Sequence, residues 1–330
     1  MPATAPMPDI ETSKDPVMTD LDRSTGRIAR QTPAVAFLHR RAVGYALGFV
    51  LFYAPFTLWV TALNALLGDH ARANIHATCL RIQLLDLVNG KGFSLLTVWG
   101  ASFVLLSGSA LLAGPLFCGR LCAAGAISEY LSRLVPDRFK IDWVRWVNPA
   151  GMRYGFLVGY LAAPMVGGSI ACAFCSYGFL ERITTGSLWT ATGFLSSSAV
   201  ITALLWLGLF GIFTKGGRGY CAFMCPVGAW QSGLHALGAK LPFTWKIRFD
   251  ATACTKCAVC VDECPMRALR LPLGREGPLV YDRHTCITCR QCVAVCKPGA
   301  LRFARGADGW AEQGPDHAHV PAGRRGEAGA

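Results

Sequence analysis

Charged side chains are scarce in this chain. Only 16% of its 330 residues are Asp, Glu, Lys or Arg, against about a quarter in soluble domains. This shortage, together with 52% hydrophobic residues and a mean hydropathy of +0.36, excludes a disordered chain and disfavours an ordinary soluble enzyme. Acids are especially few, because 20 acidic residues face 32 basic ones and leave a net charge of +12.

Several cofactor signatures are also missing. The sequence has no Gly-x-Gly-x2-Gly fingerprint and no phosphate-binding loop, which disfavours hydride chemistry with nicotinamide or flavin. It has no Cys-x2-Cys-His haem attachment, and none of its seven histidines lies in a long uncharged segment, which disfavours haem. The bases follow apolar segments or cysteines rather than an aromatic-rich groove, so nucleic acid is not an expected partner.

Four long segments contain no charged residue, and each is longer than the ~20 apolar residues that a membrane-spanning helix needs. Buried helices of soluble proteins rarely stay uncharged on every side over such a length. The sequence therefore predicts an α-helical membrane domain with four transmembrane helices, at residues 42–67, 93–117, 154–180 and 187–214.

The distribution of bases predicts the orientation of these helices. Arginines and lysines are frequent before the first segment, between the second and third, and after the fourth, whereas the other two connections have few. Because cytoplasmic loops carry the excess of Lys and Arg, we expect a multi-pass protein of the bacterial inner membrane with both termini in the cytoplasm.

Eight of the fifteen cysteines form a double motif near the C-terminus. Cys-x2-Cys-x2-Cys-x3-Cys-Pro occurs once, and the same cysteine spacing recurs 32 residues later without the immediate proline. This is the spacing of a bacterial two-cluster ferredoxin, in which the fourth cysteine of each motif binds the other cluster. It predicts one [4Fe–4S] cluster on Cys254, Cys257, Cys260 and Cys296, and a second on Cys286, Cys289, Cys292 and Cys264.

Zinc and disulfides are the alternative uses of these cysteines. Structural zinc takes four cysteines, usually as two pairs, and the double pattern of eight favours iron–sulfur clusters. Disulfides require an oxidising compartment, whereas the expected orientation places this segment in the cytoplasm.

Four further cysteines belong to an internal repeat with an offset of 103 residues. Each copy follows a predicted span, contains Cys-x3-Cys and leads into an amphipathic stretch. Cysteines at i and i+4 share a helix face, so the two pairs could supply four thiolates to one additional cluster or redox site. Unmetallated packing thiols are the alternative. The pairs are Cys118 with Cys122 and Cys221 with Cys225.

Three cysteines remain. Cys172 and Cys175 form a Cys-x2-Cys pair that we expect near the periplasmic end of the third span, either as a redox or metal site or as small packing residues. Cys79 lies in the first periplasmic connection near two histidines, and a buried or free thiol is its simplest interpretation.

The combination of four spans, repeated Cys-x3-Cys turns and a double ferredoxin motif resembles the NapH/MauN-type membrane ferredoxins, which are related to the C-terminal half of NosR and to CcoG-like proteins. The resemblance covers residues 37–305, although that family usually has proline after both Cys-x3-Cys pairs and here Ala123 follows the first. The resemblance implies quinol oxidation and electron delivery, often to a periplasmic redox system.

The expected organisation is a disordered tail at 1–36, a transmembrane domain at 37–245, a small α+β ferredoxin domain with two [4Fe–4S] clusters at 246–305, and a second disordered tail at 306–330. The expected function is membrane-bound electron transfer from the quinol pool to a partner redox protein. The alternative is an accessory or maturation factor that reduces a metal, thiol or flavin centre in a partner protein.

Overall fold

The computed structural model describes residues 33–52, 98–163, 175–184, 197–271, 277–307 and 309–310. In chain order the elements before the ferredoxin motif are α1 (Pro33–Phe52), α4 (Val98–Ala113), α5 (Leu116–Arg120), α6 (Ala123–Leu134), the short 3-10 helices η2 (Asp137–Phe139) and η3 (Trp143–Arg145), α7 (Pro149–Ala162), α9 (Ser176–Thr184), α11 (Ser197–Thr202), the π-helical η5 (Ala203–Ile212), α12 (Gly219–Phe223) and α13 (Pro226–Gly238). The motif itself contains β1 (Lys246–Phe249), α14 (Val259–Asp262), β2 (Leu269–Arg270), β3 (Val280–Tyr281), α15 (Gln291–Val295) and β4 (Leu301–Ala304).

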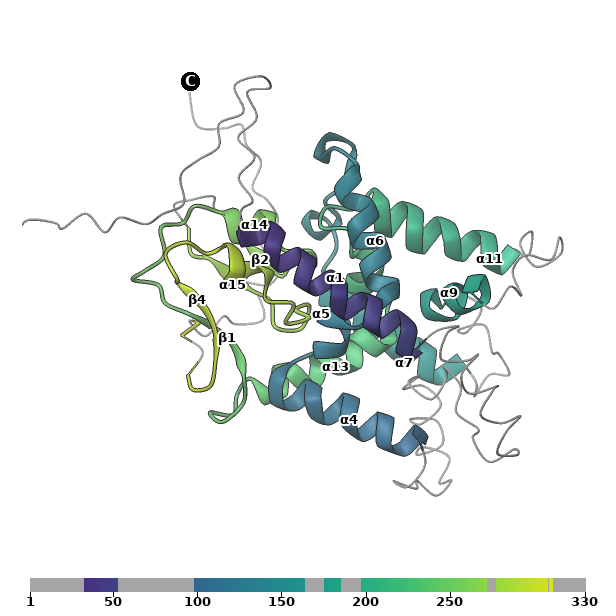
Figure 1. The fold of residues 1–330 in the computed structure, drawn as a ribbon, viewed down its shortest axis with the longest axis horizontal. Coiled ribbons are helices and arrows are strands. Elements are labelled where there is room, and N and C mark those ends of the chain that lie inside the picture. Colours follow the sequence, from purple (N-terminus) through teal and green to yellow (C-terminus); the bar gives the residue numbers. More distant parts are fainter. Residues whose placement is uncertain are drawn as a thin grey trace, which may run out of the picture.

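The helices before residue 245 form one packed assembly, which we call the helical part. Helix α13 packs against both α4 and α7, and α6 packs against η5. Helix starts are set locally: the Asn148 side chain accepts a hydrogen bond from the Ala150 amide before Pro149 opens α7, and Pro226 opens α13. Figure 1 shows α4, α7 and α11 extending toward one side of the molecule, while β1 and β4 lie on the opposite side.

The four predicted spans correspond only in part to described helices. Helices α1, α4 and α7 and the α11–η5 segment each cover a portion of one span, and residues 53–67, 93–97, 164–174 and 187–196 lie outside the described residues. Within the described part of the chain, no helix combines the length and the apolar character required to cross a bilayer. The four-helix transmembrane arrangement therefore stays a prediction.

The third span does not form one continuous helix. Helix α7 ends at Ala162, Cys175 is not helical, and α9 begins at Ser176. The absence of charge between residues 154 and 180 gave no sign of this break. The segment does contain Pro164, and proline inside a helix removes a backbone hydrogen bond.

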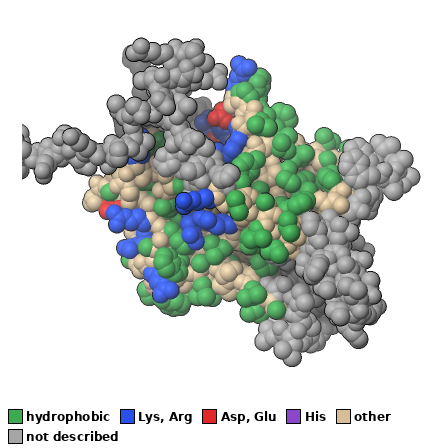
Figure 2. Space-filling view, viewed as in Figure 1, with side chains coloured by type: hydrophobic (Ala, Val, Ile, Leu, Met, Phe, Trp, Pro, Cys, Tyr) green, Lys and Arg blue, Asp and Glu red, His purple; other side chains and the backbone are tan. Residues whose placement is uncertain are grey.

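Large apolar side chains are exposed on the outward faces of these helices. Leu105 of α4 is 72% exposed, Val158 of α7 is 66% exposed and Leu204 of η5 is 64% exposed. Figure 2 shows hydrophobic side chains spread over the helical part, whereas Lys and Arg gather over the part that contains the ferredoxin motif. Contiguous exposed apolar surface of this kind marks a surface that another apolar phase or partner covers.

The ferredoxin motif folds into two short antiparallel sheets. Strand β1 pairs with β4, with Lys246 opposite Ala304, and β2 pairs with β3. Each sheet therefore joins the two halves of the motif, and this arrangement brings the last cysteine of one half toward the first three cysteines of the other.

The ferredoxin module extends further than expected. Trp310, which the sequence suggested was part of a disordered tail, is buried, stacks on Phe249 and Tyr281, and donates a hydrogen bond from Nε1 to the Ile247 carbonyl. We therefore define the ferredoxin module as the described residues from 246 to 310. A single tryptophan in a Gly-rich segment gave no periodic pattern, which is why the boundary was placed too early.

A buried ion network joins the helical part to the ferredoxin module. Glu129 of α6 accepts hydrogen bonds from Arg41 of α1, at 3.0 Å to each carboxylate oxygen, and from Nε of Arg218 at 2.6 Å. Both arginines also donate to the Tyr45 hydroxyl, which in turn donates to the Gly119 carbonyl. Arg41 further reaches the Gln291 side chain of α15 at 3.5 Å, so one network links five separate segments.

Replacing Glu129 by Gln should destabilise the protein by about 3–5 kcal/mol, because two guanidiniums would stay buried without their carboxylate. Burial alone would raise the Glu129 pKa, but Arg218 and Arg41 hold it below the usual value. This carboxylate therefore stabilises the fold above its unfolded-state pKa, and the contribution disappears as the pH falls through the lowered folded-state value.

The measurement is thermal unfolding of the purified protein, followed by circular dichroism. Asp137→Asn is the matched control, because the Asp137 carboxylate is exposed to solvent and its pair with Lys140 should contribute less than about 1 kcal/mol. Equal unfolding temperatures for the Glu129→Gln protein and the wild type would contradict a stabilising network.

Candidate metal centres

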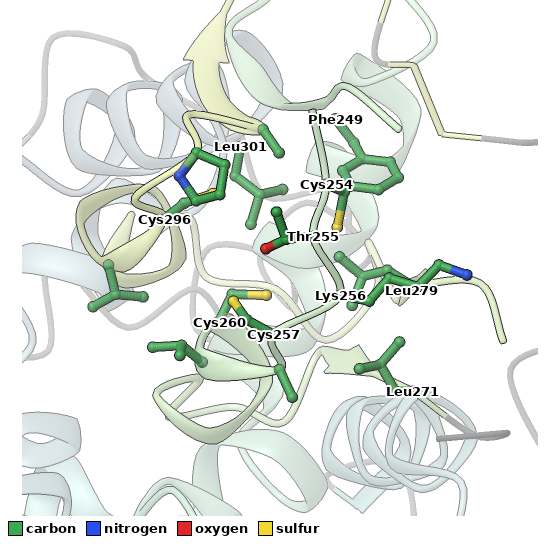
Figure 3. Close-up of a pocket in the computed structure, with 15 residues that line it drawn as sticks. Phe249, Cys254, Thr255, Lys256, Cys257, Cys260, Leu271, Leu279, Cys296 and Leu301 are labelled. Atoms are coloured by element: carbon green, nitrogen blue, oxygen red, sulfur yellow. The ribbon is translucent and has the colours of Figure 1, made fainter. Parts of the chain in front are cut away.

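The first candidate centre is a cavity lined by Cys254, Cys257, Cys260 and Cys296 (Figure 3). Three of these cysteines come from the first half of the motif and one from the second, as the spacing predicts. The rest of the lining is mainly apolar and includes Phe249, Leu271, Leu279 and Leu301. Thiols converging in an apolar cavity provide the donor set of a four-cysteine cluster.

The second candidate centre is a neighbouring cavity lined by Cys264, Cys286, Cys289 and Cys292. Its cysteines follow the reciprocal division, with one thiol from the first half and three from the second. The backbone amides of Ala268 and Thr288 donate to the sulfurs of Cys264 and Cys286, both at 3.3 Å. Such amides would stabilise negative charge on the sulfurs.

Both cysteine loops have the same unusual backbone. Lys256 and Ala258 flank Cys257 with positive φ angles of 53° and 67°, and Thr288 and Arg290 flank Cys289 with 47° and 64°. Residues other than glycine rarely adopt this left-handed conformation, and it persists where the surrounding structure or function requires it. In each loop the strained residues reverse the chain just before the short helix, α14 or α15, that carries the third cysteine.

A third cavity, of about 770 Å³, lies in the helical part. Its lining includes both Cys-x3-Cys pairs, so the structure brings together Cys118, Cys122, Cys221 and Cys225. The thiol of Cys118 donates to Oε1 of Gln231 in α13 at 3.3 Å, which links the two copies of the repeat. This volume falls within the range of small-molecule and cofactor sites, which is about 300–1,000 Å³.

The two Cys-x3-Cys turns have the same local structure. In each copy the first cysteine lies in a five-residue helix, α5 or α12, and the second is the N-cap of a longer helix, α6 or α13. The N-cap angles are φ −72°, ψ 102° at Cys122 and φ −73°, ψ 113° at Cys225. The turn before Ala123 therefore has the same geometry as the turn before Pro226.

Cys175 also lines the third cavity. Cys175 therefore lies beside the Cys-x3-Cys pairs, whereas the sequence suggested that it lies apart from them, near the opposite end of the membrane domain. Cys172 and Cys79 lie outside the described residues.

Two arginines flank the third cavity, and the sequence gave them no role beyond orientation. Arg218 donates from Nη1 to the Cys118 carbonyl at 2.7 Å. Arg153 is fully buried and donates from Nη1 to Ser232 and to the His284 carbonyl, while its Nε and Nη2 have no hydrogen-bond partner in the described part of the chain. The three buried arginines (Arg41, Arg153 and Arg218) and the buried Glu129 together carry a net charge of +2.

A glycine in each repeat makes room for one of these arginines. A Cβ on Gly125 would lie 2.6 Å from Nη1 of Arg218, and a Cβ on Gly228 would overlap Nη2 of Arg153. The two glycines occupy equivalent positions, three residues after the second cysteine of each pair. The alignment of the two repeats shows that a glycine occurs at the same position in both. Nothing in the sequence indicated that an arginine side chain would pack against each of these glycines.

Burial makes the uncoordinated thiols hard to ionise. It raises the pKa of Cys221 to about 12 and raises the pKa of Cys118 and Cys122. In the ferredoxin module it also raises the pKa of Cys260 and Cys286 to about 12. Thiolates at these positions need a compensating positive charge, which a bound metal centre supplies on coordination.

The third cavity adjoins the second, and the second adjoins the first, because neighbouring cavities share buried side chains. Cys118 belongs to the same buried cluster as Cys264, Cys289 and Ile287, so the third cavity adjoins the second. Cys286 and Cys292 of the second cavity and Cys260 and Cys296 of the first pack around one further apolar core. Among the described residues, no three His, Cys, Asp or Glu side chains lie close enough to surround a single metal ion. A cubane differs from a single ion because its four thiolates bind four separate iron atoms.

Comparison with known families agrees with this geometry. A family model described as a 4Fe-4S dicluster domain matches residues 246–297, which include all eight ferredoxin cysteines. A second, described as a 4Fe-4S binding domain, matches residues 95–142 and 198–244, and each of these segments contains one Cys-x3-Cys pair. The chain carries two ferredoxin-type 4Fe–4S domains. No curated protein and no solved structure matches the chain.

These matches confirm the predicted C-terminal ferredoxin domain and support iron–sulfur electron transfer as the general function of this chain. The residues fit the group: thiol donors surround each cavity, the linings are largely apolar, and buried cations lie beside the third cavity.

The division of the eight cysteines between two cavities is testable with single substitutions. Cys296→Ser should perturb the same electron paramagnetic resonance signal as Cys254→Ser, because both side chains line the first cavity. Cys264→Ser should instead perturb the signal affected by Cys286→Ser. Cys175→Ser is the control and should leave both signals unchanged. Pairing of Cys296 with Cys286 would contradict the crossed arrangement.

Proposed function

We propose that this chain is a membrane-bound iron–sulfur protein that passes electrons from the quinol pool to a partner redox protein. The observation that carries the proposal is the series of three cysteine-lined cavities, which runs from the apolar helical part to the exposed Cys257 of the ferredoxin module. Contact between successive cavities gives electrons a continuous path. The resemblance to NapH/MauN-type membrane ferredoxins adds the quinone pool as the electron source.

The exposed apolar faces of α1, α4, α7 and η5 support insertion in a lipid bilayer. We propose the bacterial inner membrane, with both chain termini in the cytoplasm. Three of the arginines that supported this orientation, Arg41, Arg153 and Arg218, are buried and belong to the interior. The orientation therefore depends on the remaining bases, such as the exposed Arg138 and Arg145 and those of the ferredoxin module.

We assign one [4Fe–4S] cluster to the four cysteines of the first cavity and a second to those of the second cavity. A third cluster on Cys118, Cys122, Cys221 and Cys225 is supported by the electrostatics around them. A cubane with four thiolate ligands carries about −2 in its oxidised form, which would balance the buried charge of +2. The unsatisfied Nε and Nη2 of Arg153 are the donors that such an anion would use.

Size and lining support quinol binding in the same cavity. About 770 Å³ leaves room beside a cluster for a quinone ring, and the lining includes Phe156, Tyr160 and Tyr177. Quinol oxidation would release two electrons and two protons; bound [4Fe–4S] centres could take up the electrons one at a time, and the protons would pass to water. The chain's own residues hold the ring among apolar side chains and keep the donor next to the first thiolates of the series.

Iron content distinguishes two clusters from three. The purified protein should contain about twelve iron and twelve sulfide atoms per chain, that is, four for each cubane. Cys118→Ser and Cys221→Ser should each lower the iron content toward about eight, because each removes one ligand of the third cluster. Cys175→Ser should retain the wild-type content. A wild-type value of about eight would remove the third cluster from the proposal.

Anaerobic mixing with quinol tests the direction of electron flow. A menaquinol or ubiquinol analogue should reduce the clusters of the detergent-solubilised protein, seen as bleaching of the visible absorption and appearance of paramagnetic signals. Filling the cavity with Gly155→Phe should slow this reduction at least about tenfold, while reduction by dithionite stays unchanged.

Clusters that dithionite reduces but quinol does not would contradict the quinol proposal. That result would favour the alternative function, in which the chain reduces a metal, thiol or flavin centre of a partner during its maturation.

A further inference from the structure

Three glycines that precede residue 245 lie directly against the cysteine loops of the second cavity. A Cβ added to any of them would overlap an atom of those loops, so the contacts depend on the absence of a side chain. The neighbouring pairs are Gly114 with Thr288, Gly119 with Ile287, and Gly216 with Pro265. The loops that carry Cys264 and Cys289 are therefore packed closely against the rest of the molecule.

Gly119 differs from the other two glycines because it follows Cys118, which lines the third cavity. A Cβ on Gly119 would overlap the Ile287 carbonyl oxygen and would lie 3.2 Å from both the amide nitrogen and the Cα of Cys289. Cys289 lines the second cavity. The backbone next to a cysteine of one cavity therefore meets the backbone of a cysteine of the other, with no side chain between them.

Two buried donors fix the peptide that makes this contact. Arg218 donates from Nη1 to the Cys118 carbonyl at 2.7 Å, and the Tyr45 hydroxyl donates to the Gly119 carbonyl at 2.6 Å. Both side chains are buried and belong to the ion network around Glu129. The peptide therefore has little freedom to move away from Cys289.

The internal repeat shows that the turn itself does not need a glycine at this position. The equivalent residue of the second copy, 103 positions later, is Ala222, which is buried in the same cluster as Cys264. Gly119 also lies within helix α5, and alanine is normally preferred to glycine inside a helix by about 1 kcal/mol. The close approach of Cys289 is therefore what excludes a side chain at residue 119.

We propose that Gly119 is a positioning residue for electron transfer, because the absence of its side chain brings Cys118 close to Cys289 and gives electrons a short crossing between the third and second cavities. The inference rests on the proposed function, since it takes the third cavity to hold a redox centre on the Cys-x3-Cys cysteines. Each crossing moves one electron: the third centre is oxidised and the second is reduced. No bond forms or breaks, and no proton moves.

The rate of this crossing can be measured in the purified holoprotein with dithionite as the electron source. Electrons then enter at the first cavity, where Cys257 is exposed, and cross the Gly119 contact in the reverse direction, so that the second centre is oxidised and the third is reduced. Rapid freeze-quench electron paramagnetic resonance follows each centre separately. The third centre is identified as the signal that Cys118→Ser removes.

Gly119→Ala should delay the signal of the third centre and leave the signals of the other two at their wild-type rates. The added Cβ forces the two backbones apart, and a displacement of about 1 Å can cost up to about a hundredfold in rate, so we expect the delay to be at least about tenfold. Unchanged iron content would show that all centres are still present. A residue that served only the fold would not separate the third signal from the other two.

Gly108→Ala is the matched control. Gly108 also lies in a helix, α4, but a Cβ there would meet nothing within 4 Å. Its signals should appear within about twofold of the wild-type rates, because a substitution that makes no new contact changes free energies by about 0.5 kcal/mol or less.

A wild-type rate for the third signal in a Gly119→Ala protein of full iron content would overturn the proposal. If that variant loses iron, the wild-type protein decides: the spin relaxation of the third centre must quicken when the second is reduced, and an unchanged relaxation rate would overturn the proposal. A wild-type protein without a third signal would also overturn it. Failure of quinol to reduce the centres leaves these results intact, because dithionite supplies the electrons, so the two proposals fail separately.

Discussion

The Glu129 carboxylate is the interaction on which the rest of this structure depends. It pairs with both Arg41 and Arg218 and offsets one of their two positive charges, which otherwise would be buried together without any counter-charge. Those arginines in turn contact Tyr45, the Cys118 carbonyl and Gln291, so the network fixes α1, the first Cys-x3-Cys turn and α15 relative to one another. Desolvated ions of this kind demand accurate geometry. The same geometry sets how the third cavity meets the second.

The internal repeat gives the third cavity its approximate symmetry. Each copy supplies a cysteine in a short helix, a cysteine at an N-cap and a glycine beside a buried guanidinium. The two longer helices, α6 and α13, begin at the cavity, so the positive ends of their dipoles also face it. A site built from thiols, helix N-termini and arginines is suited to an anionic group. In the ferredoxin module no buried arginine is among the residues that line the two cavities, and in the second cavity backbone amides donate to the sulfurs of Cys264 and Cys286.

The sequence was most informative where the structure is local. Cysteine spacing alone predicted which thiols line the first and second cavities, because tight loops and short strands determine those positions. It also revealed the repeat around Cys118 and Cys221. Burial of Glu129, Arg153 and Arg218 was not predictable in the same way, since it depends on contacts between residues about 80 to 130 positions apart. A count of arginines does not distinguish an arginine that is buried in the interior from one that is solvated on the surface.

Cys175 shows the other limit of pattern recognition. An uncharged run from 154 to 180 has the length of a membrane span, yet hydropathy does not distinguish a crossing from a return to the same side. Cys175 lies within this run, five residues before its end at residue 180, and it lines the same cavity as Cys118 and Cys225. The helix break after Ala162 therefore serves the site, because a straight helix would have carried Cys175 away from it. The geometry of the third cavity thus depends on this interruption as much as on the two Cys-x3-Cys turns.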